Sequence, residues 1–183
     1  NFQSLILQMK VYKPDLVYMG GTYDQAGQLV KQMREKGITA AFMGPDGFDS
    51  SEFVNIAKDA AKGVYYTTVA GPIDQFPAAA EFDRMFQEKF KKKPESFALY
   101  AYDCGKVIVE GLQAAIRENG GKKPTREALC KAVRKVSAKG ITGEIEFDGK
   151  GDRKLSAYYV MFLKDGTYPG ATVKTITAGP PGN

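Results

Sequence analysis

Apolar residues in the first 70 positions alternate between two spacings. The first spacing marks one face of a helix; its members are Phe2, Leu5, Ile6 and Met9. The second is a short continuous run at 16–19, Leu-Val-Tyr-Met, after Pro14-Asp15. A short apolar run bounded by turn residues is typical of a buried parallel strand. The pattern therefore predicts a helix that ends at Pro14, followed by a buried strand.

The same alternation occurs twice more. One helix face carries Ala26, Leu29, Val30 and Met33 and ends at Gly37; the next carries Phe53, Ile56, Ala57 and Ala60 and ends at Gly63. Ser50 or Ser51 is the predicted N-cap of the latter helix. Strands are predicted at 40–43 and 64–70, with a turn at 44–47. Residues 1–70 thus predict a parallel α/β sheet with right-handed crossovers.

Gly71-Pro72 ends this rhythm, and helices dominate the next 65 residues. An amphipathic helix carries Phe82, Met85, Phe86 and Phe90. A longer helix spans about 99–117, and its predicted inward residues are Val107, Ile108, Leu112, Ala115 and Ile116. Thr125 is the predicted cap of a further helix, with Leu129, Val133 and Val136 inward.

The C-terminal part predicts strands joined by turns. Residues 144–147 alternate in polarity, and 148–152 form a turn cluster. The strongest strand pattern is 157–163, followed by a hairpin turn at 164–167. A weak strand at 173–176 and a loose end at 178–183 complete the chain.

Composition limits the class of protein. The chain has 183 residues, of which 43% are hydrophobic, so it can bury a core in one domain or two small ones. No apolar run approaches the roughly 18 residues of a membrane span, and these 183 residues contain no basic-then-apolar stretch typical of a secretory leader. Because the chain starts with Asn1 inside a helix, we expect a truncated beginning, although an N-terminal tail explains the same feature.

Charge is unevenly distributed along a chain of net charge +5. Residues 71–160 carry 17 basic and 13 acidic side chains, including Lys89, Lys91, Lys92, Lys93, Lys122 and Lys123. These lysines raise the alternative of nucleic-acid binding. Solvated helix ends are the favoured interpretation, because cations suit a helix C-terminus and no aromatic platform or recognised motif accompanies them.

Residues that bind metals or catalyse reactions are scarce. Histidine is absent, which removes the commonest general base and metal ligand. Cys104 and Cys130 are too few for a cysteine-rich zinc site. On adjacent antiparallel helices they would be offset by about 10 Å, too far for a disulfide, so we predict two free and mostly buried thiols.

Known catalytic loops are missing. Gly20-Gly21-Thr22-Tyr23 is neither a dinucleotide loop nor a P-loop, and no G-x-S-x-G elbow exists. Asp148 and Asp152 flank glycines, but their spacing does not match a calcium loop, and a plain turn is favoured. No cofactor or metal is expected.

A candidate ligand site follows from the predicted sheet. Thr22, Tyr23 and Asp46 come directly after strands, and ligands of open α/β sheets sit outside the carboxyl ends of the strands. An isolated carboxylate at Asp46 would form a charge-assisted hydrogen bond with a ligand's ammonium group. A turn-forming role is the simpler alternative for Asp46, as core packing is for Tyr102.

Five motifs stand in the order of one known family. They are Gly20-Gly-x5-Gly-Gln28, Phe42-Met-Gly-Pro-Asp-Gly47, Asp74-Gln-x-Pro77, Tyr100-Ala-Tyr102 and Gly143-x-Ile-x-Phe-Asp148 with Gly151-Asp152. In these the chain resembles the leucine/isoleucine/valine-binding proteins, the periplasmic substrate-binding components of branched-chain amino-acid ABC transporters. The resemblance covers nearly the whole chain.

The resemblance implies a type I periplasmic binding fold with Rossmann-like lobes of parallel sheet, of which this chain is about the C-terminal half. Residues 1–70 would belong to lobe II, 71–160 to lobe I, and 161–183 would return to lobe II. Two hinge strands would be present, at 65–70 and 158–163.

The same resemblance assigns residues to the ligand. Asp46 matches the acidic residue that receives the α-ammonium group. Thr22 matches a position where relatives often carry tyrosine, and Tyr23 is the neighbour that would replace that ring. Tyr102 matches a lobe I aromatic near the cleft. The residues that hold the α-carboxylate would lie in the other half.

The function expected from the resemblance is non-enzymatic binding of a small, branched-chain type amino acid and its delivery to a membrane permease. The implied location is the periplasm, or the cell exterior with a lipid anchor in a Gram-positive bacterium. Alternatives are a ligand-sensing domain of a receptor or regulator and a Rossmann-like enzyme. Exposed edges of a half-chain also predict a dimer.

Overall fold

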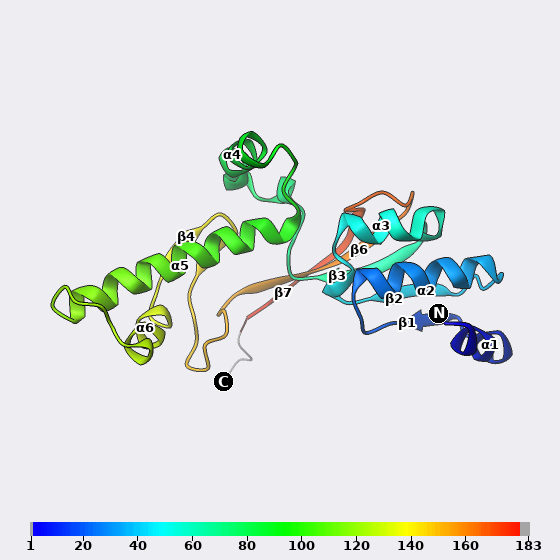
Figure 1. Ribbon diagram of the computed structural model, residues 1–183, viewed down its shortest axis with the longest axis horizontal. Coiled ribbons are helices and arrows are strands. Elements are labelled where there is room, and N and C mark those ends of the chain that lie inside the picture. The colour runs from blue at the N-terminus through cyan, green and yellow to red at the C-terminus, as the bar shows by residue number, and fades with distance from the viewer. Residues whose placement is uncertain (1, 180–183) are drawn as a thin grey trace. The chain divides into compact units, whose positions relative to one another are not determined.

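The computed structural model describes residues 2–179, which divide into two compact units (Figure 1). Of the described residues, unit 1 comprises 2–71 together with 158–176. Unit 2 comprises 72–157 and 177–179. The chain therefore passes between the units at three points. The predicted loose end at 178–183 falls mostly outside the described residues.

Unit 1 is an α/β unit built on a five-stranded sheet. The strands are β1 (Leu16–Tyr18), β2 (Ala41–Gly44), β3 (Val64–Thr68), β6 (Ser156–Leu163) and β7 (Ala171–Ala178), in the order β1-β2-β3-β6-β7. The first three are parallel, as predicted. The long strand β6 instead pairs antiparallel with β3, from Val64 opposite Leu163 to Thr68 opposite Tyr159. The sheet is therefore mixed.

The helices of unit 1 begin and end at the expected signals. They are α1 (Gln3–Tyr12), α2 (Tyr23–Glu35) and α3 (Ser51–Ala57), followed by a 3-10 turn (Lys58–Ala61). Ser50 is the N-cap of α3, and its hydroxyl accepts a hydrogen bond from the Glu52 amide. Gly37 and Gly63 have φ values of +74° and +78°, a backbone conformation that glycine adopts without strain.

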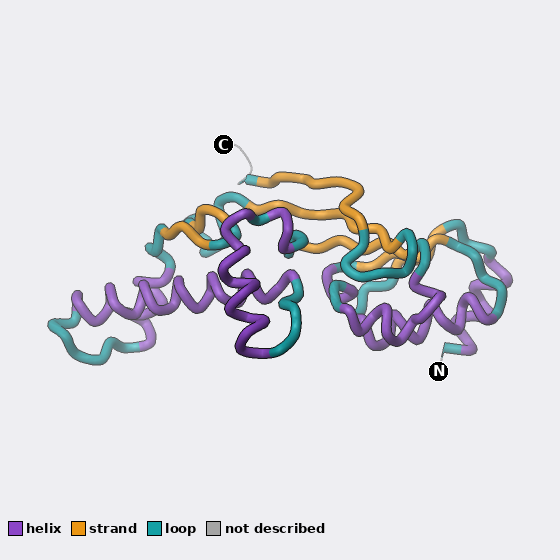
Figure 2. The backbone as a smooth tube through the Cα atoms, turned by 90° about the horizontal axis from the view of Figure 1, so that it is seen from above, coloured by secondary structure: helices purple, strands orange, loops and turns teal. Residues whose placement is uncertain are grey.

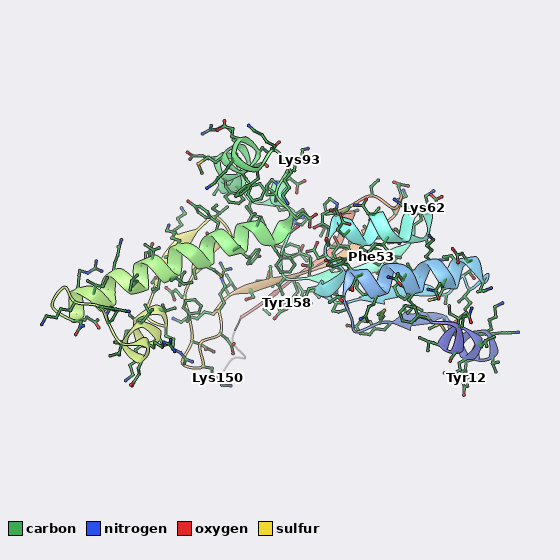
Figure 3. The ribbon with its side chains drawn as sticks, in the orientation of Figure 1. Tyr12, Phe53, Lys62, Lys93, Lys150 and Tyr158 are labelled. Carbon is green, nitrogen blue, oxygen red and sulfur yellow. The ribbon has the colours of Figure 1, made fainter. Side chains whose placement is uncertain are left out.

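Helices α2 and α3 lie side by side (Figure 1). The predicted face of α2 is buried, and a Cβ atom at Gly27 would lie 2.9 Å from the side chain of Ile56 on α3. The absence of a side chain at Gly27 therefore allows the close approach. Phe53 extends from α3 into this core (Figure 3).

The prediction that β1 is a buried strand is wrong. Leu16 is 51% exposed and Tyr18 is 59% exposed, because β1 is an edge strand with a neighbour only at β2. The face predicted for α1 is also mostly open, with only Ile6 buried, and Tyr12 extends into solvent (Figure 3). The helices of unit 1 lie on one side of its strands (Figure 2).

Unit 2 is mainly helical. It contains α4 (Ala80–Phe90), α5 (Ser96–Glu118), α6 (Arg126–Val133) and an antiparallel hairpin, β4 (Ala138–Gly140) and β5 (Gly143–Ile145). Two 3-10 turns precede α4, at Ile73–Gln75 and Pro77–Ala79. Ala79, Phe82 and Leu99 form a buried cluster between α4 and the start of α5. Thr125 caps α6 as predicted, by accepting from the Ala128 amide.

The buried face of α5 differs from the predicted one. The buried residues follow a spacing of four from Leu99 through Asp103, Val107 and Gly111 to Ala115. Val107 and Ala115 are inward as predicted, whereas Ile108 is 53% exposed and Leu112 is 36% exposed. Gly111 allows this stripe to meet α6, because a Cβ atom there would lie 2.6 Å from the side chain of Val133.

Asp103 is the polar member of that stripe and is 3% exposed. Its carboxylate accepts hydrogen bonds from the amides of Ile141 and Thr142, both at 2.8 Å, and from the Thr142 hydroxyl at 2.7 Å. Arg153 holds the same turn by donating to the carbonyl of Glu144 at 2.9 Å. A buried carboxylate is tolerated when its oxygens are hydrogen-bonded, so Asp103 fixes the β4–β5 hairpin on α5.

The cysteine prediction is half right. Cys104 and Cys130 are both free, as expected, but both are exposed rather than buried. Cys104 follows Asp103 and so lies about 100° around the helix from the buried stripe. The helical pattern alone did not show which face of α5 is covered.

The lysine-rich positions form two separate groups. Lys91, Lys92 and Lys93 precede Ser96, the first residue of α5, whereas Lys122 and Lys123 follow its last residue, Glu118. Figure 3 shows Lys93 at the connection between α4 and α5. A helix of 23 residues spans about 34 Å. The two groups therefore do not combine into one basic surface.

The cluster at 148–152 is the predicted turn. The Asp148 carboxylate accepts hydrogen bonds from the amides of Lys150, Gly151 and Asp152, each at 2.9 Å. These amide donors, Asp152 foremost, lower the pKa of Asp148 below its usual value. The Asp148 carboxylate is hydrogen-bonded within its own turn, which is consistent with a structural role.

Candidate functional site

The carboxyl ends of β1 and β2 meet at one edge of the sheet. Tyr18 pairs with Met43, and the Met19 amide donates to the Met43 carbonyl at 2.9 Å. The turn after β1 and the loop after β2 then approach each other directly. A Cβ atom at Gly47 would overlap the carbonyl oxygen of Gly21 and lie 3.4 Å from the Cα of Thr22. The structure thus brings the predicted residues Thr22, Tyr23 and Asp46 to one place.

Asp46 begins a 3-10 turn, Asp46–Phe48. Its backbone carbonyl accepts from the Asp49 amide at 2.9 Å, so the main chain closes the turn. The Asp46 side chain is exposed, and no partner for its carboxylate is found among residues 2–179. An Asp that forms a turn through its side chain would use that carboxylate locally. The Asp46 carboxylate is instead available to a ligand.

Thr22 and Tyr23 begin helix α2 at the same edge. Thr22 is the N-cap residue, and its hydroxyl donates to the Asp24 carboxylate at 2.6 Å. This hydrogen bond lowers the pKa of Asp24, which is therefore ionised at neutral pH. Tyr23 is 38% exposed. The edge therefore presents two carboxylates, a hydroxyl and a partly exposed phenol ring, a set that suits a cationic group.

Stacked aromatic rings support the loop that carries Asp46. Phe48 stacks on Phe42 at a centroid distance of 5.7 Å and on Phe53 at 5.3 Å. The Phe48 ring lies where a Cβ atom of Gly44 would be. Because Phe48 is 1% exposed, it cannot move aside freely. The glycine at the end of β2 therefore allows the ring to anchor the loop under the sheet edge.

A second carboxylate in this loop was not predicted from the sequence. Asp49 is 7% exposed, and it accepts hydrogen bonds from the Thr68 hydroxyl and the Tyr168 hydroxyl, both at 2.7 Å. Thr68 is the last residue of β3, and Tyr168 lies in the connection between β6 and β7. The only local signal was an acidic residue before a helix, which is typical of a cap or turn.

Tyr102 belongs to unit 2, in the first turns of α5. Its ring is 47% exposed and contacts Phe82 edge-on at 5.2 Å. One face therefore packs against the α4 core while the remainder is open to solvent. The structure shows the packing role directly, and contact with a ligand stays a prediction.

The edge presents groups that form hydrogen bonds. Within residues 2–179 no group of three or more His, Cys, Asp or Glu side chains is placed to hold a metal ion. The carboxylates, hydroxyl and phenol of the edge can accept or donate hydrogen bonds. These features suit recognition of a small polar molecule.

Comparison with known proteins identifies the family. The family model described as periplasmic binding protein matches residues 1–167. The chain belongs to this family. It is 36% identical over 163 residues to the Leu/Ile/Val-binding protein homolog 1 of Brucella abortus, which confirms the resemblance drawn from the motifs. It is also 33% identical over 168 residues to the leucine-, isoleucine-, valine-, threonine-, and alanine-binding protein of Pseudomonas aeruginosa.

Solved structures confirm the type I periplasmic binding fold of this family member. A leucine-binding protein from Thermotoga maritima superposes with a TM-score of 0.78 at 25% identity, over 98% of this chain and 49% of that one. The branched-chain amino acid transporter substrate-binding protein from Streptococcus pneumoniae, solved with isoleucine, gives 0.76 at 25% identity and the same coverage.

The chain spans less than half the length of the curated relatives. The matches cover 88% and 91% of this chain but only 42% and 43% of the two relatives. Periplasmic binding proteins are non-enzymatic, and family membership indicates a periplasmic or extracellular location. Across the described residues, every helix is too short or too polar to cross a membrane.

Proposed function

We propose that this chain is part of a binding protein that captures a small amino acid of the branched-chain type and delivers it to the permease of an ABC transporter. The ligand binds between two lobes and stabilises a closed form. The protein works in the periplasm, or lipid-anchored outside a Gram-positive cell, without turnover of the ligand.

The free carboxylate of Asp46 supports this proposal most directly. It lies at the sheet edge where the turns after β1 and β2 touch, and it is exposed and unpaired within the described chain. A ligand ammonium group placed there gains a charge-assisted hydrogen bond. Tyr23 supplies a neighbouring ring for an apolar side chain, and Tyr102 contributes from the other lobe.

The division of the chain supports the two-lobe proposal. We assign unit 1 to part of lobe II and unit 2 to part of lobe I. Strand β3 ends at Thr68, three residues before the chain leaves unit 1 after Gly71. Strand β6 begins at Ser156, next to the point where the chain returns to unit 1 at Tyr158. They pair side by side, so one hinge would contain both crossings.

Calorimetric titration tests the proposed function. The protein at its full natural length is titrated with leucine, isoleucine, valine and alanine, and with 4-methylpentanoate, which is leucine without its ammonium group. We expect amino acids to bind and 4-methylpentanoate to bind about 10- to 150-fold more weakly, because hydrogen bonds to charged groups contribute about 1.5–3 kcal/mol.

Two outcomes would contradict the proposal. Equal binding of leucine and 4-methylpentanoate would show that the ammonium group is not recognised. Absence of heat with all four amino acids would remove this ligand class. The 183-residue chain is titrated in parallel. Its affinity, compared with that of the full-length protein, shows how much of the binding site this chain contributes.

Self-association of the 183-residue chain is a further prediction. Edge strand β1 exposes Leu16 and Tyr18, and an uncovered edge is a template for pairing with another strand. We expect sedimentation velocity to show a fraction of dimer that increases with protein concentration. Leu16→Lys should lower this fraction, because a charge on an edge strand disfavours pairing. A monomer at all concentrations would contradict this.

A further inference from the structure

We infer that Asp49 is a positioning residue for the ligand site, which holds the Asp46 loop against the end of β3 and the β6–β7 connection. The inference rests on the proposed role of Asp46 and extends it to a residue that does not touch the ligand. Asp49 is buried, whereas Asp46, three residues earlier, is exposed. The two carboxylates of one loop therefore have different roles.

The contacts of Asp49 join three segments that are distant in sequence. Its Oδ2 accepts from the Thr68 hydroxyl across 19 residues, and its Oδ1 accepts from the Tyr168 hydroxyl across 119 residues. Its amide donates to the Asp46 carbonyl. Each carboxylate oxygen thus has a donor, and the main chain of the Asp46 turn is fixed at the same residue.

The network continues to the point where the chain leaves unit 1. The Thr68 hydroxyl, which donates to Asp49, also accepts from the Ala70 amide at 3.0 Å. Gly71 follows and is the last residue of this segment of unit 1. A Cβ atom at Gly71 would lie 2.6 Å from the ring of Tyr159, the residue paired with Thr68. The ligand loop and the exit of β3 are therefore connected through two side chains, Asp49 and Thr68.

This connection bears on affinity because a loop held in its binding conformation loses less freedom when the ligand arrives. The apparent affinity falls in proportion to the fraction of molecules whose loop is competent. Removal of one donor from Asp49 leaves a buried carboxylate oxygen without that partner, and the loop then relaxes to satisfy it. The ligand must restore the original position.

The test uses Tyr168→Phe, which removes one hydroxyl and keeps the ring. Equilibrium dialysis with labelled leucine on the full-length protein is expected to show about two- to tenfold weaker binding. Tyr66→Phe is the matched control: Tyr66 is buried, and its hydroxyl donates at 2.6 Å to the carbonyl of Pro169 in the same connection, a hydrogen bond to the main chain and not to the Asp49 carboxylate. We expect this control to bind leucine within about twofold of wild type.

A double-mutant cycle separates positioning from general destabilisation. If Asp49 acts through Asp46, Tyr168→Phe reduces affinity in the wild-type background but by less than about twofold when Asp46→Asn is already present. Equal reductions in both backgrounds would overturn the inference, since the effect would then not pass through Asp46. Adding the control substitution Tyr66→Phe to Tyr168→Phe is not expected to restore the affinity for leucine.

Hydrogen exchange without ligand distinguishes failure of the inference from failure of the proposed function. In Tyr168→Phe the amides of Asp49 and Ala70 should exchange about two- to tenfold faster, while those of Leu29 and Val30 in α2 remain unchanged. Unchanged exchange at Asp49 and Ala70, or equal acceleration in α2, overturns the inference whether or not leucine binds. Faster local exchange in a protein that binds no amino acid contradicts the proposed function alone.

Discussion

The Asp46→Asn variant is expected to bind leucine about 10- to 150-fold more weakly than the wild type. The substitution keeps the shape of the side chain and removes its charge, so the ammonium group loses a charge-assisted hydrogen bond of about 1.5–3 kcal/mol. Titration calorimetry on the full-length protein measures this difference directly.

The same variant should fold as well as the wild type. Asp46 is exposed, and its carboxylate has no partner within residues 2–179, so its neutralisation should change the free energy of unfolding by less than about 0.5 kcal/mol. Asp59→Asn is the matched control on the same unit, since the Asp59 side chain is 97% exposed in a surface ion pair with Lys62. Figure 3 shows Lys62 on the α3 side of unit 1. Equal affinity in Asp46→Asn and wild type would remove Asp46 from the site.

The Gly47→Ala variant is expected to lose both stability and affinity. Its new Cβ atom would overlap the Gly21 carbonyl, which is main chain and cannot rotate away. Overpacking of this kind costs about 1–3 kcal/mol of unfolding free energy. The turns that carry Thr22 and Asp46 would have to separate, so the affinity for leucine should fall as well. Urea unfolding and calorimetry report the two effects.

Gly20→Ala provides the control in the turn after β1, which Gly47 approaches. Apart from the adjoining residues of the chain, no atom of residues 2–179 lies within 4 Å of a Cβ position at Gly20, so we expect the unfolding free energy to stay within about 0.5 kcal/mol of wild type. If Gly47→Ala were as stable as Gly20→Ala, the close approach of the two turns would not exist in solution.

The amino-acid sequence was sufficient to predict the order of elements in unit 1 and the edge where the candidate residues gather. Apolar spacing distinguishes helices from strands, and the caps at Ser50 and Thr125 lie where local chemistry placed them. The carboxyl ends of parallel strands lie at one edge. The adjacency of Thr22 and Asp46 therefore followed from the alternation of elements alone.

Local sequence could not predict exposure. An apolar pattern predicts which residues share a face of a helix or strand, but it does not show whether another element covers that face. The pattern therefore predicts β1, Ile108 and Leu112 to be buried, although they are exposed. The stripe of four-residue spacing on α5 contains Asp103 and two positions without large side chains. An apolar count therefore predicted Val107 and Ala115 correctly but added the exposed residues Ile108 and Leu112 to the buried face.

The tertiary structure alone decided the partners of the buried carboxylates. Asp103 binds amides 38 and 39 residues away, and Asp49 accepts from Tyr168 across 119 residues. Local sequence shows only an acidic residue on a helix or in a turn. Whether that residue faces solvent, as Asp46 does, or is buried and hydrogen-bonded, as Asp49 is, depends on segments that only the folded chain brings together, because a carboxylate is buried stably only where donors from elsewhere replace its water.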